Sequence, residues 1–335
     1  MSMDQNIPFL LSLAFIVGGL VLLAKSADMF VGAASSLARR FGISPLLVGM
    51  VIIGFGTSAP ELAVSVMSGF SGHSNLSLGN AYGSCIFNIA AILGIAAVLR
   101  PMRVKPSING IAVPLLLLIT AFSWFVVSDG VFERSNGVAL LVGFAVLFPV
   151  YCWYDQRGMK PMPARRTASA KGGGLRDGIL LVVGLLLLVL SSHILVWGCV
   201  DFARDVLHVS DLLIGLTVVA VGTSLPELAS AIASARRGES EFVLGNIVGS
   251  NFFNTLAVVG LAGTISPFGD FSRYVVMRDL PVMFFFSASI AAFGVNYRHP
   301  RQEGRISRVA GVFWLVAFAV YLVVLILQET SRSGA

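Results

Sequence analysis

Ten stretches of predominantly apolar residues follow one another along the chain, with short polar connections between them. Each stretch holds about 20 residues or more, and a helix of that length crosses a hydrocarbon layer roughly 30 Å thick. Such a helix satisfies its own backbone hydrogen bonds inside the membrane. We therefore predict an all-α integral membrane protein with ten transmembrane helices. The predicted spans are residues 7–38, 42–70, 77–99, 107–128, 136–154, 177–204, 209–235, 241–266, 275–296 and 307–328.

The composition of the chain agrees with this interpretation. Of its 335 residues, 56% are hydrophobic and 12% charged, and the mean hydropathy is +0.87. These values lie outside the usage of soluble globular domains, and no stretch remains for a sizeable soluble domain. The first apolar stretch follows Asp4 and has no basic segment before it, so we expect a retained span and not a cleaved signal peptide.

The distribution of basic residues predicts the orientation. The formal net charge is +6, and 17 of the 23 Lys and Arg residues lie in alternate connections. Basic residues accumulate in cytoplasmic connections, so we predict an inner (plasma) membrane protein with both termini on the outer side and no affinity for nucleic acid. The segment DQRGMKPMPARRTASAKGGGLRDG is predicted to be a flexible cytoplasmic linker, with contact to anionic lipid left open. The basic connections hold residues 39–40, 100–105, 157–176, 236–237 and 298–308.

The two halves of the chain repeat one another. A shift of 166 residues aligns 46–97 with 212–263 without a gap and gives 23 identities in 52 positions, which indicates an internal duplication. Each half contains five spans, an odd number, so the second copy enters the membrane from the opposite side. We predict two inverted five-helix repeats, an arrangement typical of secondary transporters with a site at the repeat interface. The predicted division is 1–155 for the first repeat, 156–176 for the linker and 177–335 for the second repeat.

Two glutamates lie in matched motifs inside this duplication. The chain reads GTSAPE at 56–61 and GTSLPE at 222–227, so Glu61 and Glu227 fall within apolar spans. In a helix, the Thr and Ser of each motif share a face with the Glu, four and three residues away. A duplication kept only for packing explains small residues, but it does not explain two carboxylates.

The prolines of these motifs predict an irregular backbone. Pro60 and Pro226 lack a backbone N–H and clash with the carbonyl four residues earlier, at Gly56 and Gly222. We expect each helix to kink and to turn carbonyl oxygens toward the protein interior. Those oxygens then need a partner, because lipid offers none.

A second pair of motifs adds hydroxyls and amides. LGNAYGSCIFN at 78–88 matches LGNIVGSNFFN at 244–254, and each places a Ser and an Asn four residues apart. The glycines at Gly79 and Gly83, and at Gly245 and Gly249, have GxxxG spacing and are expected to let helices approach closely.

These groups predict a cation site with oxygen ligands only. Carboxylate, hydroxyl and amide oxygens suit hard cations such as Ca²⁺ and Na⁺, whereas Zn²⁺ and Cu⁺ prefer His and Cys. Two buried carboxylates must be neutralised by cations or protons, so the empty carrier should change its orientation slowly and exchange becomes obligatory without ATP. We expect no resident cofactor, since Ca²⁺ and Na⁺ are cargo. The candidate ligands are Glu61, Glu227, Asn88, Asn254, Thr57, Ser58, Ser84, Thr223, Ser224 and Ser250.

With these motifs the chain resembles the sodium/calcium exchanger branch of the cation/Ca²⁺ antiporter superfamily, in its short bacterial and archaeal form. The resemblance implies four repeat-bearing spans packed around clustered cation sites, and long, tilted first and sixth spans that slide during alternating access. It also implies that Glu61 and Glu227 are the main Ca²⁺ carboxylates, that Asn88 supplies an amide ligand, and that the Thr and Ser residues serve Na⁺. Many relatives have Asp where this chain has Asn254, which argues against K⁺ cotransport.

Other functions remain open at this stage. Protons could neutralise the same carboxylates, so Ca²⁺/H⁺ or Na⁺/H⁺ exchange is the alternative within the class. A cation channel is the alternative from another class, because an acidic, oxygen-lined site also conducts. The chain has no GxGD or HExxH element and no nucleophile beside a base, so we expect no enzyme. No obligate protein partner is evident.

Overall fold

The computed structural model describes residues 3–70, 74–158, 173–202, 220–269 and 273–333. Its elements are helices, several of them with π-helical turns (labelled η), and four short strands. In the first half they are α1 (Met3–Phe41), α2 (Pro45–Val48), η1 (Gly49–Gly54), α3 (Phe55–Thr57), α4 (Ala59–Phe70), α5 (Ser74–Phe87), η2 (Asn88–Leu93), α6 (Gly94–Leu99), β1 (Met102–Val104), η3 (Ile108–Ala112), α7 (Val113–Val126), β2 (Val131–Phe132) and α8 (Arg134–Gly158).

The second half repeats much of this order. Its elements are α9 (Gly173–Asp201), α11 (Ala220–Gly222), α12 (Leu225–Arg237), α13 (Ser240–Phe252), η6 (Phe253–Val258), α14 (Val259–Ile265), β3 (Phe268–Gly269), η7 (Val275–Asp279), α15 (Leu280–Gly294), β4 (Gly304–Ile306) and α16 (Arg308–Ser333). After the 166-residue shift, η6 begins one residue before η2, and η7 begins one residue after η3. The two halves therefore share local backbone irregularities as well as sequence.

The prediction of an all-α membrane protein is confirmed. Within the described residues, eight helices are long and apolar enough to cross a membrane, and the bent pair Pro45–Thr57 and Ala59–Phe70 makes a ninth span. The predicted span 209–235 falls partly on residues 203–219, which lie outside the described residues, and α11 and α12 form its described remainder. The predicted count of ten helices agrees with this arrangement. The domain boundaries at 155 and 177 stay a prediction.

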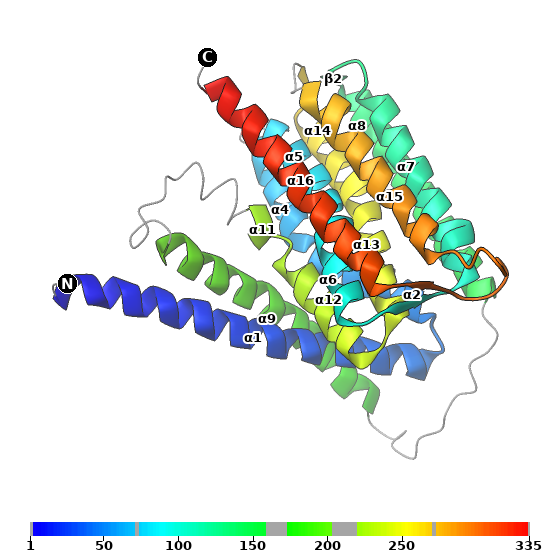
Figure 1. Ribbon diagram of the computed structural model, residues 1–335, viewed down its shortest axis with the longest axis horizontal. Coiled ribbons are helices and arrows are strands. Elements are labelled where there is room, and N and C mark those ends of the chain that lie inside the picture. The colour runs from blue at the N-terminus through cyan, green and yellow to red at the C-terminus, as the bar shows by residue number, and fades with distance from the viewer. Residues whose placement is uncertain (1–2, 71–73, 159–172, 203–219, 270–272, 334–335) are drawn as a thin grey trace.

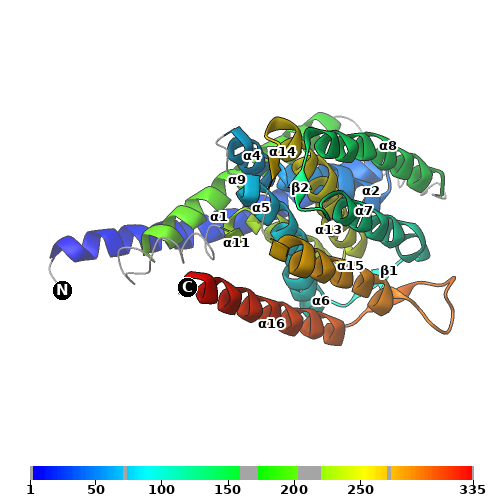
Figure 2. The same ribbon diagram turned by 90° about the horizontal axis from the view of Figure 1, so that it is seen from above.

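Helices α1 and α9 form a separate antiparallel pair that crosses the other helices at a steep angle (Figure 1). The pair extends well beyond the rest of the molecule when seen from above (Figure 2). Glycines bring the two backbones together, because a Cβ on Gly19 would lie 2.9 Å from the Cα of Leu195, and one on Gly184 would lie 2.9 Å from the Cα of Phe30. These helices are the long, tilted first and sixth spans that the resemblance implies.

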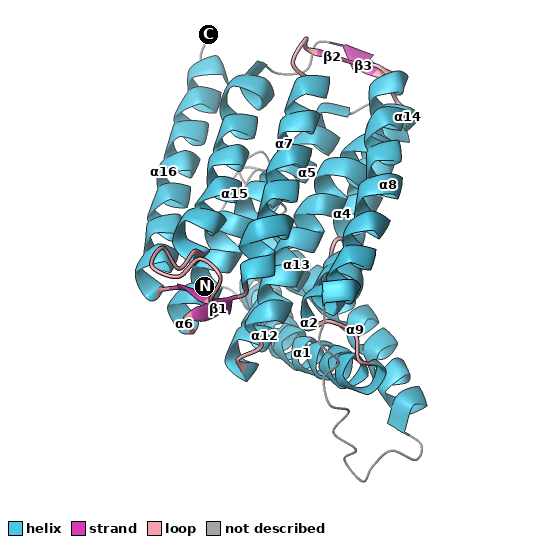
Figure 3. Cartoon of the chain, turned by 90° about the vertical axis from the view of Figure 1, so that its right-hand side faces the viewer, coloured by secondary structure: helices cyan, strands magenta, loops and turns pink. Residues whose placement is uncertain are grey.

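The two short sheets mark opposite ends of the helix bundle (Figure 3). Strands β1 and β4 pair antiparallel at one end, and β2 and β3 pair antiparallel at the other. Strands β1 and β4 belong to connections that the charge pattern places on one side of the membrane. The structure therefore agrees with the predicted alternation of connections.

The core of the bundle is built around α13. Most residues of the apolar span Ser240–Ile265 are buried and none is exposed, whereas α8 and α16 carry rows of exposed Val, Leu and Phe side chains. Exposed apolar rows of this kind suit contact with lipid. The duplicated motifs thus lie on inner helices and the plain apolar spans lie outside.

Candidate cation-binding site

Both proline motifs interrupt their helices. Helix α3 ends at Thr57 and α4 begins at Ala59, and the two segments differ in direction by 45°. In the second repeat, α11 ends at Gly222 and α12 begins at Leu225. Each proline lies in the first turn of the new helix, where a missing N–H costs no hydrogen bond. The predicted break is confirmed in both repeats.

One of the carbonyls at these breaks has a definite partner. The hydroxyl of Ser192 in α9 donates a hydrogen bond of 2.9 Å to the carbonyl of Gly222. Its counterpart in the first repeat, Ser26, instead donates to the carbonyls of Leu22 and Leu23 within α1. The α1–α9 pair therefore contacts the two helix breaks differently.

The two glutamates are fully buried and are held by serines of the opposite repeat. Both side chains are 0% exposed. Ser224 Oγ donates to Glu61 Oε1 over 3.0 Å, and Ser58 Oγ donates to Glu227 Oε1 over 3.1 Å. The two bonds are equivalent under the 166-residue shift. Each helix break therefore presents its serine to the carboxylate of the other repeat.

Ser84 joins the same cluster from α5. Its hydroxyl donates to Glu61 Oε1 over 3.4 Å and accepts a bond of 3.2 Å from Ser224 Oγ. Its counterpart Ser250 differs, because it donates to the carbonyl of Gly54 over 3.2 Å. The structure thus brings Ser84 to a carboxylate and places Ser250 on the backbone of η1.

Two asparagines that the sequence analysis missed position the glutamate backbones. Asn80 Nδ2 donates to the carbonyl of Glu61, and Asn246 Nδ2 donates to the carbonyl of Glu227, each over 3.4 Å. Their Oδ1 atoms accept from the opposite repeat, Asn80 from Thr223 over 3.5 Å and Asn246 from Thr57 over 3.3 Å. The signal was available, since the self-alignment pairs Asn80 with Asn246.

The threonines are placed differently from the serines. Thr57 Oγ1 donates to the carbonyls of Ile53 and Gly54 as well as to Asn246. Thr57 also forms a side-chain hydrogen bond with the carboxylate of Glu227. Thr57 and Ser58 therefore both bond the carboxylate of the opposite repeat. That the Thr, Ser and Glu of one motif converge on one point stays a prediction.

Asn88 and Asn254 are buried amides with unused oxygens. Asn88 Nδ2 donates to Asn251 Oδ1 over 3.1 Å, while its own Oδ1 has no partner among the described residues. Asn254 is 0% exposed, and within the described part of the chain neither of its polar atoms has a partner. It lies in η6, which packs against both α4 and α5.

The unused oxygens define what the site can bind. Among the candidate ligands, four buried oxygens lack hydrogen-bond partners within the described residues: Glu61 Oε2, Glu227 Oε2, Asn88 Oδ1 and Asn254 Oδ1. A buried, unpaired polar atom is costly, and a cation coordinated by such oxygens removes the cost. Within the described ranges no group of three His, Cys, Asp or Glu residues could hold a metal. The donor set therefore suits a hard cation held by carboxylate, hydroxyl and amide oxygens.

Glycines bring α13 close to the first repeat. A Cβ on Gly245 would lie 2.4 Å from the carbonyl oxygen of Leu46, and one on Gly249 would lie 2.6 Å from the Cα of Met50. The expected close approach is confirmed here. For Gly79 and Gly83 it stays a prediction, because most of the segment that matches η1, 215–220, lies outside the described residues.

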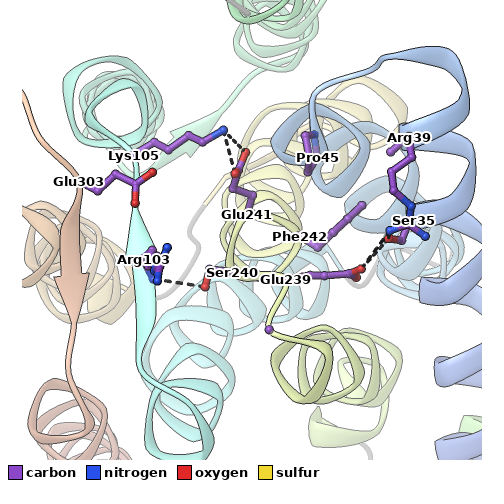
Figure 4. Close-up of a pocket in the computed structure, with 12 residues that line it drawn as sticks. Ser35, Arg39, Pro45, Arg103, Lys105, Glu239, Ser240, Glu241, Phe242 and Glu303 are labelled. Carbon is purple, nitrogen blue, oxygen red and sulfur yellow. Dashed lines mark hydrogen bonds and ion pairs between the residues drawn. The ribbon is translucent and has the colours of Figure 1, made fainter. Parts of the chain in front are cut away.

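A separate cavity of about 310 Å³ lies at the β1–β4 end of the bundle (Figure 4). Two ion pairs lie along it, since Lys105 binds Glu241 at 2.8 Å and Arg39 lies 3.6 Å from Glu239. Residues from four predicted cytoplasmic connections line it, so these connections lie together at one end. These ion pairs distinguish the cavity from the central site, whose carboxylates are bonded by serines.

The model of the sodium/calcium exchanger protein family matches residues 11–153 and 178–327, most of the chain. The protein therefore belongs to the sodium/calcium exchanger family. One matched stretch falls in each predicted repeat.

Individual relatives agree with this assignment. The chain is 38% identical over 316 residues to a putative antiporter, CaxA, of Alkalimonas amylolytica, which covers 93% of this chain and 98% of the relative. It is 37% identical to the inner membrane protein YrbG of Escherichia coli strain K12, with coverage of 94% and 97%. A solved structure of the sodium-calcium exchanger NCX_Mj, soaked with Na⁺ and Sr²⁺, superimposes with a TM-score of 0.80 at 28% identity and covers 93% of this chain and 98% of that one.

Proposed function

We propose that the protein is a secondary antiporter that exchanges Ca²⁺ for Na⁺ by alternating access. The observation that carries the proposal is the pair of buried carboxylates, Glu61 and Glu227, each bonded to a serine of the opposite repeat and each keeping one free oxygen. Both repeats contribute to one site, so a movement between the repeats changes the site as a whole.

The mechanism follows from the charge of the site. Two carboxylates that are 0% exposed bear two formal negative charges when ionised. One Ca²⁺ or several Na⁺ ions neutralise them, and the loaded carrier can then change its orientation. The empty carrier retains the charges and changes orientation slowly, which enforces exchange. Sliding of the α1–α9 pair is the movement that the family resemblance implies.

The ligands have distinct proposed roles. Glu61 and Glu227 neutralise the cation, and Asn88 and Asn254 offer buried amide oxygens. Ser58, Ser84 and Ser224 hold the carboxylates and can turn toward a bound ion. Thr57, Thr223 and Ser250 contact the asparagines and backbone that position the site, Thr57 also bonds Glu227, and all three hydroxyls stay candidate Na⁺ ligands. With Asn254 in place of a third carboxylate, transport needs no K⁺.

The membrane placement is part of the proposal. The relative from Escherichia coli is named an inner membrane protein. The basic connections then face the cytoplasm, and both termini face outward. We propose no enzymatic activity, no resident cofactor and no obligate protein partner, and the lipid around the apolar helices serves as solvent. Labelling single cysteines at the termini with a membrane-impermeant maleimide tests the orientation.

The counter-ion is tested by ⁴⁵Ca²⁺ uptake into proteoliposomes. Vesicles loaded with Na⁺ at equal pH are compared with Na⁺-free vesicles that hold a pH gradient. The proposal expects uptake with internal Na⁺ alone. Uptake with the pH gradient alone would establish the proton-coupled alternative, and uptake with neither gradient would establish a channel.

A further inference from the structure

The buried face of α4 is polar beyond Glu61. The buried residues of this helix are Glu61, Ser65, Ser68 and Gly69, spaced as one face of a helix. None of its Leu, Val, Met or Phe side chains is fully buried, and Met67 is 69% exposed. The polar face therefore continues from the central site toward the end of α4 that leads to residues 71–73.

Helix α5 places a second serine level with Ser65. Three residues connect α4 to α5, and the two helices pack against each other, which makes an antiparallel hairpin. Asn80 bonds the carbonyl of Glu61, which fixes the level of the two helices. Measured from this level, Ser65 lies four residues further along α4, about 6 Å away, and Ser77 lies three residues earlier in α5, about 4.5 Å away. Because the two helices are antiparallel, both displacements run in the same direction.

Both hydroxyls are buried without a partner. Ser65 and Ser77 are each 0% exposed, and neither Oγ has a hydrogen-bond partner within the described part of the chain. A helical hydroxyl ordinarily bonds the carbonyl one turn earlier, as Thr120 does with Leu116 over 2.9 Å. Two unsatisfied hydroxyls at one level of a hairpin indicate that a ligand completes them.

The second repeat lacks this feature. The 166-residue shift places Ala231 and Val243 at the positions of Ser65 and Ser77, and both are fully buried. The bond of Asn80 to Thr223 is also only partly buried, whereas the equivalent bond of Asn246 to Thr57 is fully buried. The central site is therefore less enclosed beside α5, the helix that carries Ser77.

We propose that Ser65 and Ser77 form a Na⁺ station between Glu61 and the membrane face at which α4 ends and α5 begins. This proposal rests on the proposed exchange function and adds to it a Na⁺-binding site on one side of the membrane only. Its ligands are neutral oxygens, which replace part of the hydration of a monovalent ion but do not compensate a second charge. It therefore serves Na⁺ and not Ca²⁺.

The test measures exchange from each face of proteoliposomes in which orientation has been established. Ser65→Ala and Ser77→Ala should each raise the KM for Na⁺ about 3- to 10-fold at the face where α4 ends and α5 begins. The KM for Na⁺ at the opposite face and the KM for Ca²⁺ at both faces should stay unchanged. Ser65→Thr retains a hydroxyl and should restore the wild-type KM.

Ser287→Ala is the matched control, since Ser287 is also fully buried with an unpartnered hydroxyl but lies in α15. An unchanged KM for Na⁺ in both Ser65→Ala and Ser77→Ala would refute the proposed Na⁺ station. Equal shifts of the KM values for Ca²⁺ and Na⁺ at both faces would also refute it. The wild type in the same vesicles separates the two proposals. Failure of its Na⁺-driven Ca²⁺ uptake would refute the exchange function itself.

Discussion

Ser224 donates a hydrogen bond to the carboxylate of Glu61 although 163 positions separate the two residues in the chain. The equivalent bond joins Ser58 to Glu227 across 169 positions. Each carboxylate is thus oriented by the helix break of the other repeat. The duplication therefore builds one shared site, and neither half contains a complete one.

Loss of a cross-repeat hydroxyl should weaken cation binding from either side. A hydrogen bond to a charged group contributes about 1.5–3 kcal/mol, so Ser58→Ala and Ser224→Ala should each weaken Ca²⁺ affinity about 10- to 100-fold. Isothermal titration of the purified protein with Ca²⁺ measures this change. Ser135→Ala, at an exposed position, is the control. Wild-type affinity in both site variants would show that these bonds do not orient the carboxylates.

The asparagines should support the site without contacting the cation. Asn246→Ala removes three buried hydrogen bonds, to the carbonyl of Glu227 and to the hydroxyls of Ser230 and Thr57. Each lost bond costs about 0.5–1.5 kcal/mol, so thermal stability and transport should both fall. Asn80→Ala should have a smaller effect on stability, because its bonds are partly buried. Thermal unfolding in detergent ranks the two variants, and the reverse order would contradict this account.

The close contact of α13 with η1 should tolerate no added methyl group. In Gly249→Ala the new Cβ would meet the Cα of Met50 at 2.6 Å, so the helices must separate at a cost of about 1–3 kcal/mol. Gly18→Ala is the matched control, because no atom lies within 4 Å of that position in the described part of the chain. Unfolding temperatures should fall for the first variant only. Equal temperatures would mean that this contact does not hold the repeats together.

A third carboxylate should change the coupling. Asn254→Asp adds a buried negative charge beside two others, and one more cation or proton must then neutralise it. We expect Ca²⁺ uptake by this variant to depend on pH, or to depend more steeply on the Na⁺ concentration than uptake by the wild type does. Uptake by the wild type should be independent of K⁺. Flux measured against pH, Na⁺ and K⁺ tests both expectations. Unchanged dependence in the variant would place residue 254 outside the cation site.

Much of the architecture could be predicted from the sequence because the membrane imposes simple rules. The length of the apolar stretches predicts the spans, and the duplication predicts equivalent helix breaks at Pro60 and Pro226. The charge pattern predicts which connections share an end, and the cavity lined by Arg39, Arg103 and Glu239 brings three of them together.

The finer geometry could not be predicted because it depends on the pairing of the repeats. Spacing within a motif places Thr57, Ser58 and Glu61 on one face, but it does not show that each has a partner in the other repeat. The roles of Asn80 and Asn246 also become visible only when the glutamate carbonyls are in place. Helical periodicity describes one helix and carries no information on such contacts.

The most direct test of the shared site is ⁴⁵Ca²⁺ uptake by Glu61→Gln and Glu227→Gln in Na⁺-loaded proteoliposomes, with Glu303→Gln as an exposed control. Each site variant loses one of two neutralising charges, so uptake should fall below about one hundredth of the wild-type rate, with insertion and the control unaffected. Comparable loss in both variants is the predicted result. Wild-type uptake by either variant would contradict the claim that the two repeats supply the halves of one cation site.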